Sequence, residues 1–303
     1  MILNHSKYYM NSGIHLSRKM KKILIYGSGS YIGNHFQASL EQEGYNVIVV
    51  DSKIITPEDV DFSGIDVVID VAGIAHINIT PDMEPLFYKV NTDTAIELCK
   101  ASKANGVSQF IYMSSMNVYG DTTDKIYSLD QEAPHNFYGR SKWLADCEIH
   151  KLGDNYFHVV SLRPPVVYGY NCKGNFFELI KLAKYMLFVP AFRNTKSIIY
   201  IDYLSNILVQ CIKNDETGIL HPQNAEYTST IDIIKAIRAA LGKKTITIYG
   251  FNWLIHFLMK INHQFERAFS DDYYDKKFST YRDNSYNKGD FKKSIFDSVR
   301  KLP

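Results

Sequence analysis

Short apolar runs alternate with stretches of helical periodicity along the first half of the chain. The helical stretches cover 33–43 and 90–104, and a further helix at 138–151 precedes a strand at 157–162. The apolar runs between them are Ile23–Tyr26, Val47–Val50, Val67–Val71 and Phe110–Met113. Strands that alternate with helices predict right-handed βαβ units and a parallel sheet buried on both faces. We therefore predict an α/β protein with a doubly wound parallel sheet.

The pattern also predicts a division of the chain into parts. Residues 1–19 carry no clear period and are expected to be a loose extension. Residues 20–165 are expected to form the nucleotide-binding domain, and about 195–222 to return to it. Residues 166–303 are expected to form mainly a smaller α/β substrate-binding domain. The segment 270–293, rich in Tyr, Asp and Lys, is only weakly patterned.

Charge and composition exclude several classes of protein. The 303 residues carry 34 Lys and Arg against 32 Asp and Glu, so there is no basic surplus of the kind that nucleic-acid binding needs. Four scattered cysteines form no CxxC pair, and the histidines form no HExxH motif, so no metal site is expected. The cysteine pattern favours reduced thiols and a cytoplasmic protein.

One apolar stretch, 251–261, needs its own interpretation. No apolar run reaches the roughly 20 residues of a membrane span. The stretch could be a membrane-surface helix or an association patch. We expect instead a helix packed against its own domain, with His256 and Lys260 at the solvent edge.

A glycine-rich loop directly follows the first predicted strand and opens the first predicted helix. Glycines at such a turn permit positive φ and let the backbone approach a pyrophosphate. The helix N-terminus adds free N–H groups and a positive dipole end. The loop is Gly27, Ser28, Gly29, Ser30, Tyr31, Ile32 and Gly33. This position between strand and helix predicts a dinucleotide site.

Asp51 ends the second predicted strand, about 20 residues beyond the glycine loop. A carboxylate at that place can accept hydrogen bonds from the adenosine ribose and would repel a 2′-phosphate. It therefore favours NAD over NADP. Asp51 could also merely cap a turn, and Lys53 is close enough to reach a phosphate.

Tyr138 and Lys142 are four residues apart and would share one face of a helix. A tyrosine has a reference pKa near 10, about 3 above neutral pH, so it needs a nearby cation to act as a base. Ser114 and Ser115 end a predicted parallel strand, where ligands of such sheets bind. The three side-chain types together indicate proton transfer to or from a hydroxyl group.

The chain resembles the extended short-chain dehydrogenases, and looks like an NAD-dependent sugar-nucleotide epimerase/dehydratase. The resemblance runs from about residue 21 to 220. It rests on the glycine loop, Asp51, Ala72-Gly73, Asn91, the segment 114–120, Tyr138-x-x-x-Lys142 and the segment 162–169. It implies a Rossmann-type sheet, NAD as cofactor, a nucleotide-sugar substrate and the option of a homodimer.

The resemblance also implies roles for single residues. Ser115 corresponds to the catalytic serine, Tyr138 to the proton acceptor and donor, and Lys142 to the group that holds the nicotinamide ribose and lowers the tyrosine pKa. The implied substrate contacts are Asn175, Arg193 and Lys196. Further implied cofactor contacts are the loop residues Gly27, Gly29, Ser30, Tyr31, Ile32 and Gly33, together with Asp51, Asp61, Phe62, Ala72, Gly73, Asn91, Ser114, Tyr138, Lys142 and Pro165.

Some positions depart from the family pattern. Ser30 stands where the middle glycine of GxxGxxG belongs, which leaves the form of the turn open. Lys196 replaces an arginine that faces the substrate diphosphate in many relatives, and a lysine is a point charge rather than a fork. Tyr203 replaces a common asparagine.

Met116 and Asn117 narrow the choice of reaction, because they occupy the two positions where dehydratases of the family have Asp-Glu. Neither side chain is an acid or base at neutral pH, so a dehydratase is not expected. Two reactions remain: 4-epimerisation of a UDP-hexose or UDP-N-acetylhexosamine through a 4-keto intermediate, and NAD(P)H-dependent 4-reduction of a 4-keto-6-deoxy sugar nucleotide. Asp51 favours the epimerase. A non-catalytic dinucleotide sensor is the alternative of another class.

Overall fold

The structure, a computed structural model, describes residues 20–75, 80–120, 124–287 and 289–300. The predicted extension at 1–19 lies outside the described residues.

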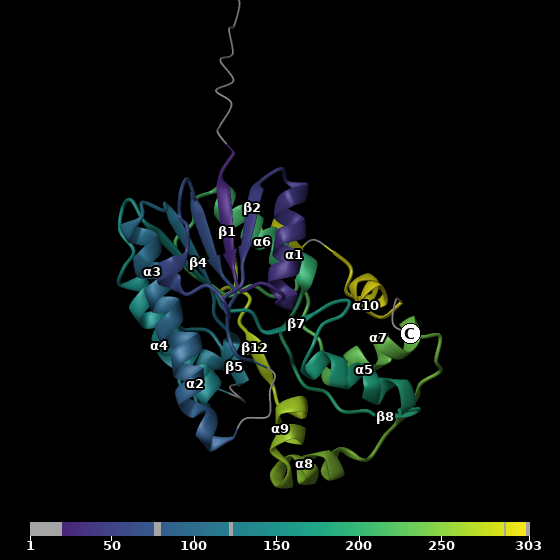
Figure 1. Ribbon diagram of the computed structural model, residues 1–303. Coiled ribbons are helices and arrows are strands. Elements are labelled where there is room, and N and C mark those ends of the chain that lie inside the picture. The colour runs from purple at the N-terminus through teal and green to yellow at the C-terminus, as the bar shows by residue number, and fades with distance from the viewer. Residues whose placement is uncertain (1–19, 76–79, 121–123, 288, 301–303) are drawn as a thin grey trace, which may run out of the picture.

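A six-stranded, fully parallel sheet forms the centre of the first part of the chain (Figure 1). Its strand order is β10-β6-β4-β3-β1-β2. The strands are β1 (Lys22–Tyr26), β2 (Asn46–Val50), β3 (Val67–Asp70), β4 (Gln109–Met113), β6 (His158–Leu162) and β10 (Gly218–Leu220). The first five lie where the apolar runs predict strands.

Helices cover both faces of this sheet because alternate residues of its strands point to opposite sides. In β1, Ile23 and Ile25 pack with the apolar faces of α1 (Tyr31–Gln42) and α6 (Ile201–Lys213). Leu24 and Tyr26 pack on the other face against α3 (Thr94–Ala104) and α4 (Phe137–His150). The protein is thus a doubly wound α/β fold, which confirms the predicted fold class.

The chain changes direction across the sheet at β1, which has β2 on one side and β3 on the other. In open parallel sheets, ligands bind beyond the carboxyl ends of the strands at such a switch point. The loops after β1, β2, β3 and β4 therefore surround the expected ligand position. They contain the glycine loop, Asp51, Ala72-Gly73 and Ser115 respectively.

The second part of the chain is built around a separate apolar cluster between α5 (Asn175–Tyr185), α7 (Thr230–Ala240) and α10 (Phe291–Val299). Two short parallel pairs flank it: β7 (Val166–Tyr168) with β9 (Ile198–Tyr200), and β8 (Phe188–Pro190) with β11 (Ile246–Ile248). A third pair joins β5 (Asp124–Ile126) to β12 (Asp272–Tyr274). Strand β12 lies inside the segment 270–293, which is only weakly patterned in the sequence.

The predicted helix at 90–104 is part of a longer and less regular one. It follows α2 (Glu84–Tyr88) through a π-helical turn at Lys89–Asp93. A π turn inserts an extra residue into a helix and is frequent at functional sites. It turns Asn91 into the protein, where the side chain is fully buried.

Helix α8 (Asn252–Ile261) confirms the helix expected at 251–261, and His256 and Lys260 are exposed as predicted. Its packing on its own domain is partial. Ile255 is its buried residue, whereas Trp253, Phe257 and Ile261 are 68%, 54% and 64% exposed. The helix is apolar on more than one face, so packing one face on the lobe leaves the other in solvent. Within the described residues, no helix combines the length and the apolar content needed to cross a bilayer.

Gly27 allows the first loop to pass directly over the backbone after β3. It has φ +120°, and a Cβ there would lie 2.8 Å from the Ala72 nitrogen. We expect Gly27→Ala to lower the free energy of unfolding by about 1–3 kcal/mol more than Gly106→Ala. Gly106 is a matched control, with φ +76° but open space around its Cβ position. Urea unfolding measures both variants, and equal losses would show that the close approach to Ala72 is unimportant.

Candidate active site

The glycine loop forms a tight turn that ends in a capped helix. Gly27 and Ser28 donate their backbone N–H groups to the Val50 carbonyl, each at 3.0 Å. Gly29 takes the positive φ of +72°, and Ser30 is extended and caps α1 by accepting from Gly33 N at 2.9 Å. The departure at Ser30 is therefore compatible with the turn, because Gly29 supplies the left-handed residue one place earlier.

The loop suits a dinucleotide because its glycines have no side chains at the positions where a phosphate would approach the backbone. A Cβ at Gly33 would lie 2.6 Å from Ser30 Oγ, and one at Gly73 would lie 3.2 Å from Lys142 Nζ. Tyr31 packs its ring 4.9 Å from that of His35, so it offers the site its main chain rather than its side chain. Ile32 packs against the core in the same way. The N-terminus of α1 thus turns its positive dipole end toward this loop, with the Gly33 N–H taken by Ser30 Oγ.

Asp51 lies at the end of β2, next to this turn. Its Oδ1 accepts from Lys53 N at 2.9 Å, so the carboxylate caps the loop, as one interpretation of the sequence has it. Lys53 is exposed. Asp61 is also exposed and caps the following turn through Ser63 N, while Phe62 is buried in the core. Of the predicted adenosine contacts, Asp51 is the one that the structure places beside the glycine turn.

Asn91 fixes the loop that follows β3. Its Oδ1 accepts from Ile74 N at 2.7 Å, and its Nδ2 donates to Ile74 O and to Ser141 Oγ at 3.2 and 3.1 Å. Both ends of the amide are therefore used within the protein. Asn91 holds the Ala72-Gly73 loop against α4, and the cofactor contact predicted for it passes through that loop.

Ser115 and Tyr138 come together across the N-terminus of α4. The Ser115 hydroxyl hydrogen-bonds the Tyr138 side chain and also accepts from Asn117 N at 3.2 Å. Gly139 makes this possible, because a Cβ there would lie 2.5 Å from the Asn117 carbonyl. Helix α4 can thus lie directly on the serine loop. Met116, by contrast, is buried in an apolar cluster and takes no part in acid–base chemistry.

Lys142 lies one turn further along α4 and is almost completely buried. Its Nζ donates to the Met113 carbonyl at 2.9 Å and lies 4.6 Å from the centre of the Tyr112 ring. Burial lowers the pKa of Lys142, whereas the charges of Asp70 and Asp146 raise it. The ammonium group is thus held between the end of β4 and Gly73.

Two influences on the Tyr138 hydroxyl add to the one predicted for Lys142. Burial raises the pKa of the Tyr138 hydroxyl, and the hydrogen bond from Ser115 lowers it in part. The lowering of that pKa by Lys142 stays a prediction. A phenolate at Tyr138 therefore needs a further positive charge nearby.

Asp70 is a charged residue of the site that the sequence reasoning missed. It ends β3, is 2% exposed, and its Oδ1 accepts from Ala72 N at 2.9 Å. Burial raises its pKa to about 6, against the opposing effect of Lys142. In the sequence, an aspartate that ends an apolar strand is only a weak indication of a functional site. Its electrostatic interaction with Lys142 is visible only in the folded structure.

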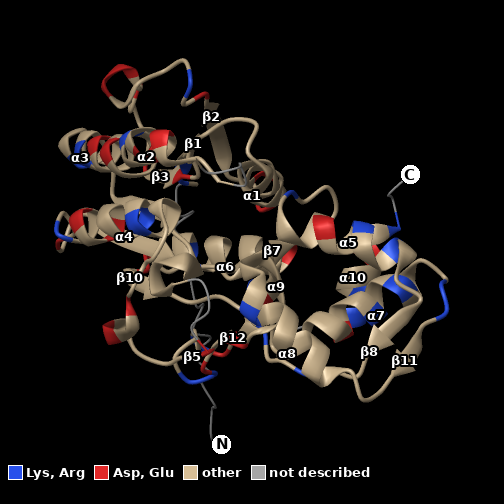
Figure 2. Ribbon diagram, turned by 90° about the horizontal axis from the view of Figure 1, so that it is seen from below, with Lys and Arg blue, Asp and Glu red and all other residues tan. Residues whose placement is uncertain are grey.

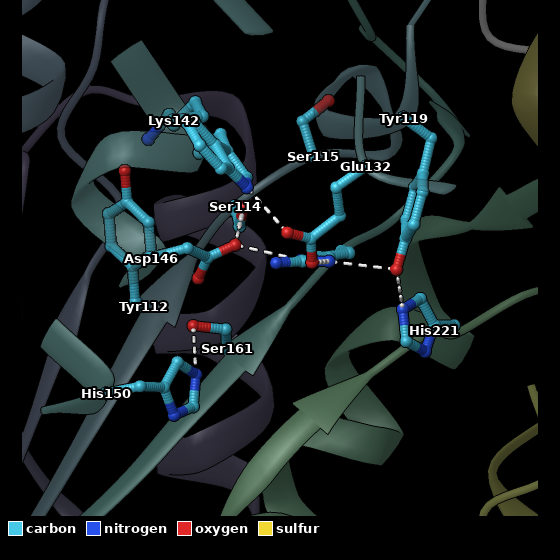
Figure 3. A network of polar contacts seen from close by, with 12 residues as sticks. Tyr112, Ser114, Ser115, Tyr119, Glu132, Lys142, Asp146, His150, Ser161 and His221 are labelled. Carbon is cyan, nitrogen blue, oxygen red and sulfur yellow. Dashed lines mark hydrogen bonds and ion pairs between the residues drawn. The ribbon is translucent and has the colours of Figure 1, made fainter. Parts of the chain in front are cut away.

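Asp146 is a second missed residue, and it occupies the same face of α4 as Tyr138 and Lys142. Its Oδ2 accepts from Ser114 Oγ at 2.7 Å and from Arg163 Nε at 2.8 Å, all fully buried (Figure 3). The Ser114 hydroxyl is therefore used inside the protein rather than toward a cofactor. The spacing of eight residues beyond Tyr138 could have revealed Asp146.

Arg163 extends this network on its other side. Its Nη1 donates to Glu132 Oε1 at 2.6 Å and to Tyr119 Oη at 2.8 Å. The Tyr119 hydroxyl is then free to donate to His221 Nε2, at 2.7 Å, as Figure 3 shows. Burial and the charge of Arg163 lower the pKa of His221 to about 3, so its ring is neutral and accepts.

Pro165, a predicted cofactor contact, is buried beside the serine loop, since Met116 N donates to Pro164 O at 2.9 Å. The predicted substrate contacts belong to the second part of the chain. Asn175 is exposed at the start of α5, and Arg193 is exposed. Lys196 donates to the Arg267 carbonyl at 2.8 Å. Burial lowers the Lys196 pKa, while Asp272 and Asp271 raise it.

The chain matches the model of the NAD dependent epimerase/dehydratase family over residues 23–187. It belongs to that family. A UDP-glucose 4-epimerase from Vibrio cholerae is 28% identical over 257 residues, which are 75% of this chain and 78% of the relative. An N-acetyl-α-D-glucosaminyl-diphospho-ditrans,octacis-undecaprenol 4-epimerase from Escherichia coli O157:H7 is 30% identical over 169 residues, about half of either chain.

Solved structures share the fold. A UDP-glucuronic acid 4-epimerase from Bacillus cereus, in complex with NAD, has a TM-score of 0.70 at 20% identity and covers 91% of this chain and 97% of its own. A dTDP-4-dehydrorhamnose reductase from Yersinia enterocolitica has a TM-score of 0.63 at 25% identity, over 77% of this chain and 85% of its own. The chain is thus an enzyme of the epimerase and reductase kind, and NAD is its cofactor, as predicted.

The Asp146–Arg163 ion pair gives a stability prediction. Asp146→Asn leaves the buried guanidinium without this charge, and we expect a loss of about 3–5 kcal/mol in the free energy of unfolding. The double variant Asp146→Leu, Arg163→Met removes both fully buried charges and should be less destabilised than Asp146→Asn, because the one partner left behind, Glu132, is 18% exposed and reaches solvent. Urea denaturation measures both. A double variant that is the less stable of the two would contradict this account.

Asp70 gives a pH prediction. Its pKa of about 6 in the folded protein exceeds the ordinary 3.8, so the folded state binds the proton more tightly. Ionisation of Asp70 therefore lowers stability as pH rises from about 4 to 7, by up to about 3 kcal/mol. The Asp70→Asn variant cannot ionise at this position, so it does not lose this stability as the pH rises. Its free energy of unfolding relative to wild type should rise over that pH range, and a constant difference would refute the role of Asp70.

Proposed function

We propose that this protein is an NAD-dependent 4-epimerase of a UDP-hexose or UDP-N-acetylhexosamine. The observation that carries the proposal is the hydrogen-bonded Ser115–Tyr138 pair. It lies past the end of β4, with Lys142 one helical turn away and the glycine turn after β1, on the far side of β3. The similarity to a UDP-glucose 4-epimerase over three quarters of the chain supports the substrate class.

In this proposal Tyr138 moves the proton of the sugar 4-hydroxyl. As a phenolate, Tyr138 accepts that proton when the alcohol is oxidised, and as the resulting phenol it returns the proton when the ketone is reduced. Ser115 can hydrogen-bond the same sugar oxygen, since its hydroxyl already meets that of Tyr138. Burial alone disfavours a phenolate here, so Ser115 also serves to stabilise it.

The remaining residues hold the cofactor and orient it. The N–H groups around Gly29 to Gly33 would bind the pyrophosphate, and Asp51 the adenosine ribose. Lys142 would bind the nicotinamide ribose from its place beside Gly73. NAD⁺, when bound, supplies the hydride acceptor and a positive ring charge, which is the further cation that Tyr138 needs.

A dehydratase receives no support from the site. Met116 and Asn117 occupy the positions after the catalytic serine, and the Met116 side chain is buried in an apolar cluster. Neither residue can remove a proton beside a ketone.

A 4-reductase of a 4-keto-6-deoxy sugar nucleotide is the second candidate, because a dTDP-4-dehydrorhamnose reductase is among the similar structures. Asp51 beside the glycine turn weighs against a 2′-phosphate and so favours NAD and the epimerase. The two candidates differ in whether reducing equivalents are consumed.

The test is incubation with a panel of UDP-hexoses and with diphospho-polyprenol-linked N-acetylglucosamine, with and without NADPH, followed by NMR. Inversion at C4 without added NADPH supports the epimerase. Stoichiometric consumption of NADPH by a 4-keto substrate, without inversion of the parent sugar, would replace it with the reductase.

Tyr138→Phe tests the proton carrier. We expect turnover to fall by at least about a thousandfold, since the variant has no acid or base at this place, while the NAD dissociation constant changes less than about threefold. Ser115→Ala serves as the comparison and should lose less turnover than Tyr138→Phe. NMR turnover assays and fluorescence titration measure the two quantities. Wild-type rates in Tyr138→Phe would remove Tyr138 from the mechanism.

A further inference from the structure

A small group of acidic and basic side chains is buried inside the described part of the chain. Most charged residues lie instead on the helices and loops that surround the sheet (Figure 2). A buried charge destabilises a fold unless an opposite charge or hydrogen bonds compensate it, so each buried one needs an explanation. The buried group consists of Asp70, Lys142, Asp146, Arg163 and Arg238.

Three of these buried charges are compensated by direct contacts. Asp146 Oδ2 accepts from Arg163 Nε at 2.8 Å, so these two form an ion pair. Arg238 lies in the second part of the chain and donates to main-chain carbonyl groups there. Asp70 and Lys142 are left, one of each sign. Among the described residues, neither of them forms an ion pair.

Asp70 and Lys142 meet at the loop that follows β3. Asp70 ends that strand, and its Oδ1 accepts from Ala72 N at 2.9 Å. The next residue, Gly73, lies so close to Lys142 that a Cβ there would be 3.2 Å from Nζ. In the sheet, Asp70 is the register partner of Tyr112, whose ring centre lies 4.6 Å from the same Nζ. The loop and the strand pair thus both bring the carboxylate close to the ammonium group.

Asp70 supplies the negative charge that Lys142 requires. Burial lowers the pKa of Lys142, and the charges of Asp70 and Asp146 raise it. The Asp146 carboxylate is already neutralised by Arg163, whereas that of Asp70 has no cation in contact. Lys142 in turn lowers the pKa of Asp70 against the effect of burial. Each of the two groups therefore favours the charged form of the other.

The other titratable groups around the pair do not replace Asp70. Glu97, which is exposed, and Asp51 act on Tyr26 rather than on Lys142. The remaining groups are Tyr26 of β1, Cys99 of α3, Tyr112 of β4 and Tyr138 of α4. Burial raises the pKa of each of these four, which favours their neutral forms.

A purely structural role does not explain why this residue is an aspartate. Burial raises the pKa of Asp70 to about 6, so its ionisation destabilises the folded protein at neutral pH. An asparagine has nearly the same shape and could accept the same hydrogen bond from Ala72 N without that cost. The negative charge is the feature that needs a function.

We propose that Asp70 is a positioning residue that keeps the Lys142 ammonium group charged and in place for NAD. A buried lysine without a counter-charge gives up its proton readily. A neutral amine would supply no positive charge to the Tyr138 phenolate. This consequence rests on the proposed function, whereas the coupling between Asp70 and Lys142 does not.

NMR titration of the full chain labelled with ¹³C-lysine tests the coupling directly. The Lys142 signal is identified by its loss in Lys142→Arg. We expect Asp70→Asn to lower the pH midpoint of Lys142 by at least about one pH unit, a tenfold change in proton affinity. Asp82→Asn is the matched control, because it removes an exposed carboxylate before α2. It should leave the Lys142 midpoint unchanged, since an exposed charge is screened by solvent.

The reverse measurement keeps the test valid if Asp70→Asn does not fold. Coupling between two sites is reciprocal, so the loss of the ammonium group should act on Asp70 to the same extent. We expect Lys142→Met to raise the pKa of Asp70 by at least about one pH unit, read from the carboxyl carbon signal of ¹³C-aspartate.

The pH dependence of NAD binding shows the functional consequence without any sugar substrate. NAD binding should weaken between about pH 7 and 11 as Lys142 loses its proton, and in Asp70→Asn this weakening should begin at least about one pH unit lower. In a Lys142→Arg background, Asp70→Asn should not move the pH profile, because an arginine stays charged. Fluorescence titration with NAD measures each variant.

The outcomes separate this inference from the proposed reaction. An unchanged Lys142 midpoint in Asp70→Asn, or an unchanged Asp70 pKa in Lys142→Met, would overturn the inference. The same would follow if Asp82→Asn shifted the Lys142 midpoint as far as Asp70→Asn does. A shifted midpoint that NAD binding does not follow would support the coupling and contradict the proposed contact between Lys142 and NAD.

Discussion

The buried guanidinium of Arg163 connects the elements that carry Ser115 and Tyr138. Its Nε binds Asp146 of α4, and its Nη1 binds Tyr119 after the serine loop. Its backbone carbonyl accepts from Tyr274 of β12 at 2.9 Å. One planar cation thus sets the position of the helix that carries Tyr138 relative to the strand end that carries Ser115. A lysine could not do this, because a point charge lacks the fixed directions of the guanidinium donors.

Much of the fold could be predicted from the sequence, because the parallel strands are continuous apolar runs and the helices between them are periodic. The pairing of Ser115 with Tyr138 was also predictable, since a strand end and a spaced helix motif define it. The roles of Asp70 and Asp146 were not, because their partners are distant in sequence. The burial of the Tyr138 hydroxyl, which raises its pKa, was not predictable either, because it is set by how the folded chain packs around that side chain.

The exposed side of α8 marks another limit of sequence patterns. An apolar stretch such as 251–261 predicts burial, yet periodicity does not say how much of the helix its own lobe covers. Here the lobe offers contacts to one face, through Ile255 and Met259.

The pairing of β12 with β5 has a consequence for biosynthesis. Residues 272–274 align with 124–126, and Tyr274 packs fully buried against Tyr119 and Ile126. During translation the ribosome must therefore add every residue from β5 to β12 before this apolar cluster can form. Until then the nascent chain exposes an incomplete apolar cluster, which is the kind of surface that chaperones bind.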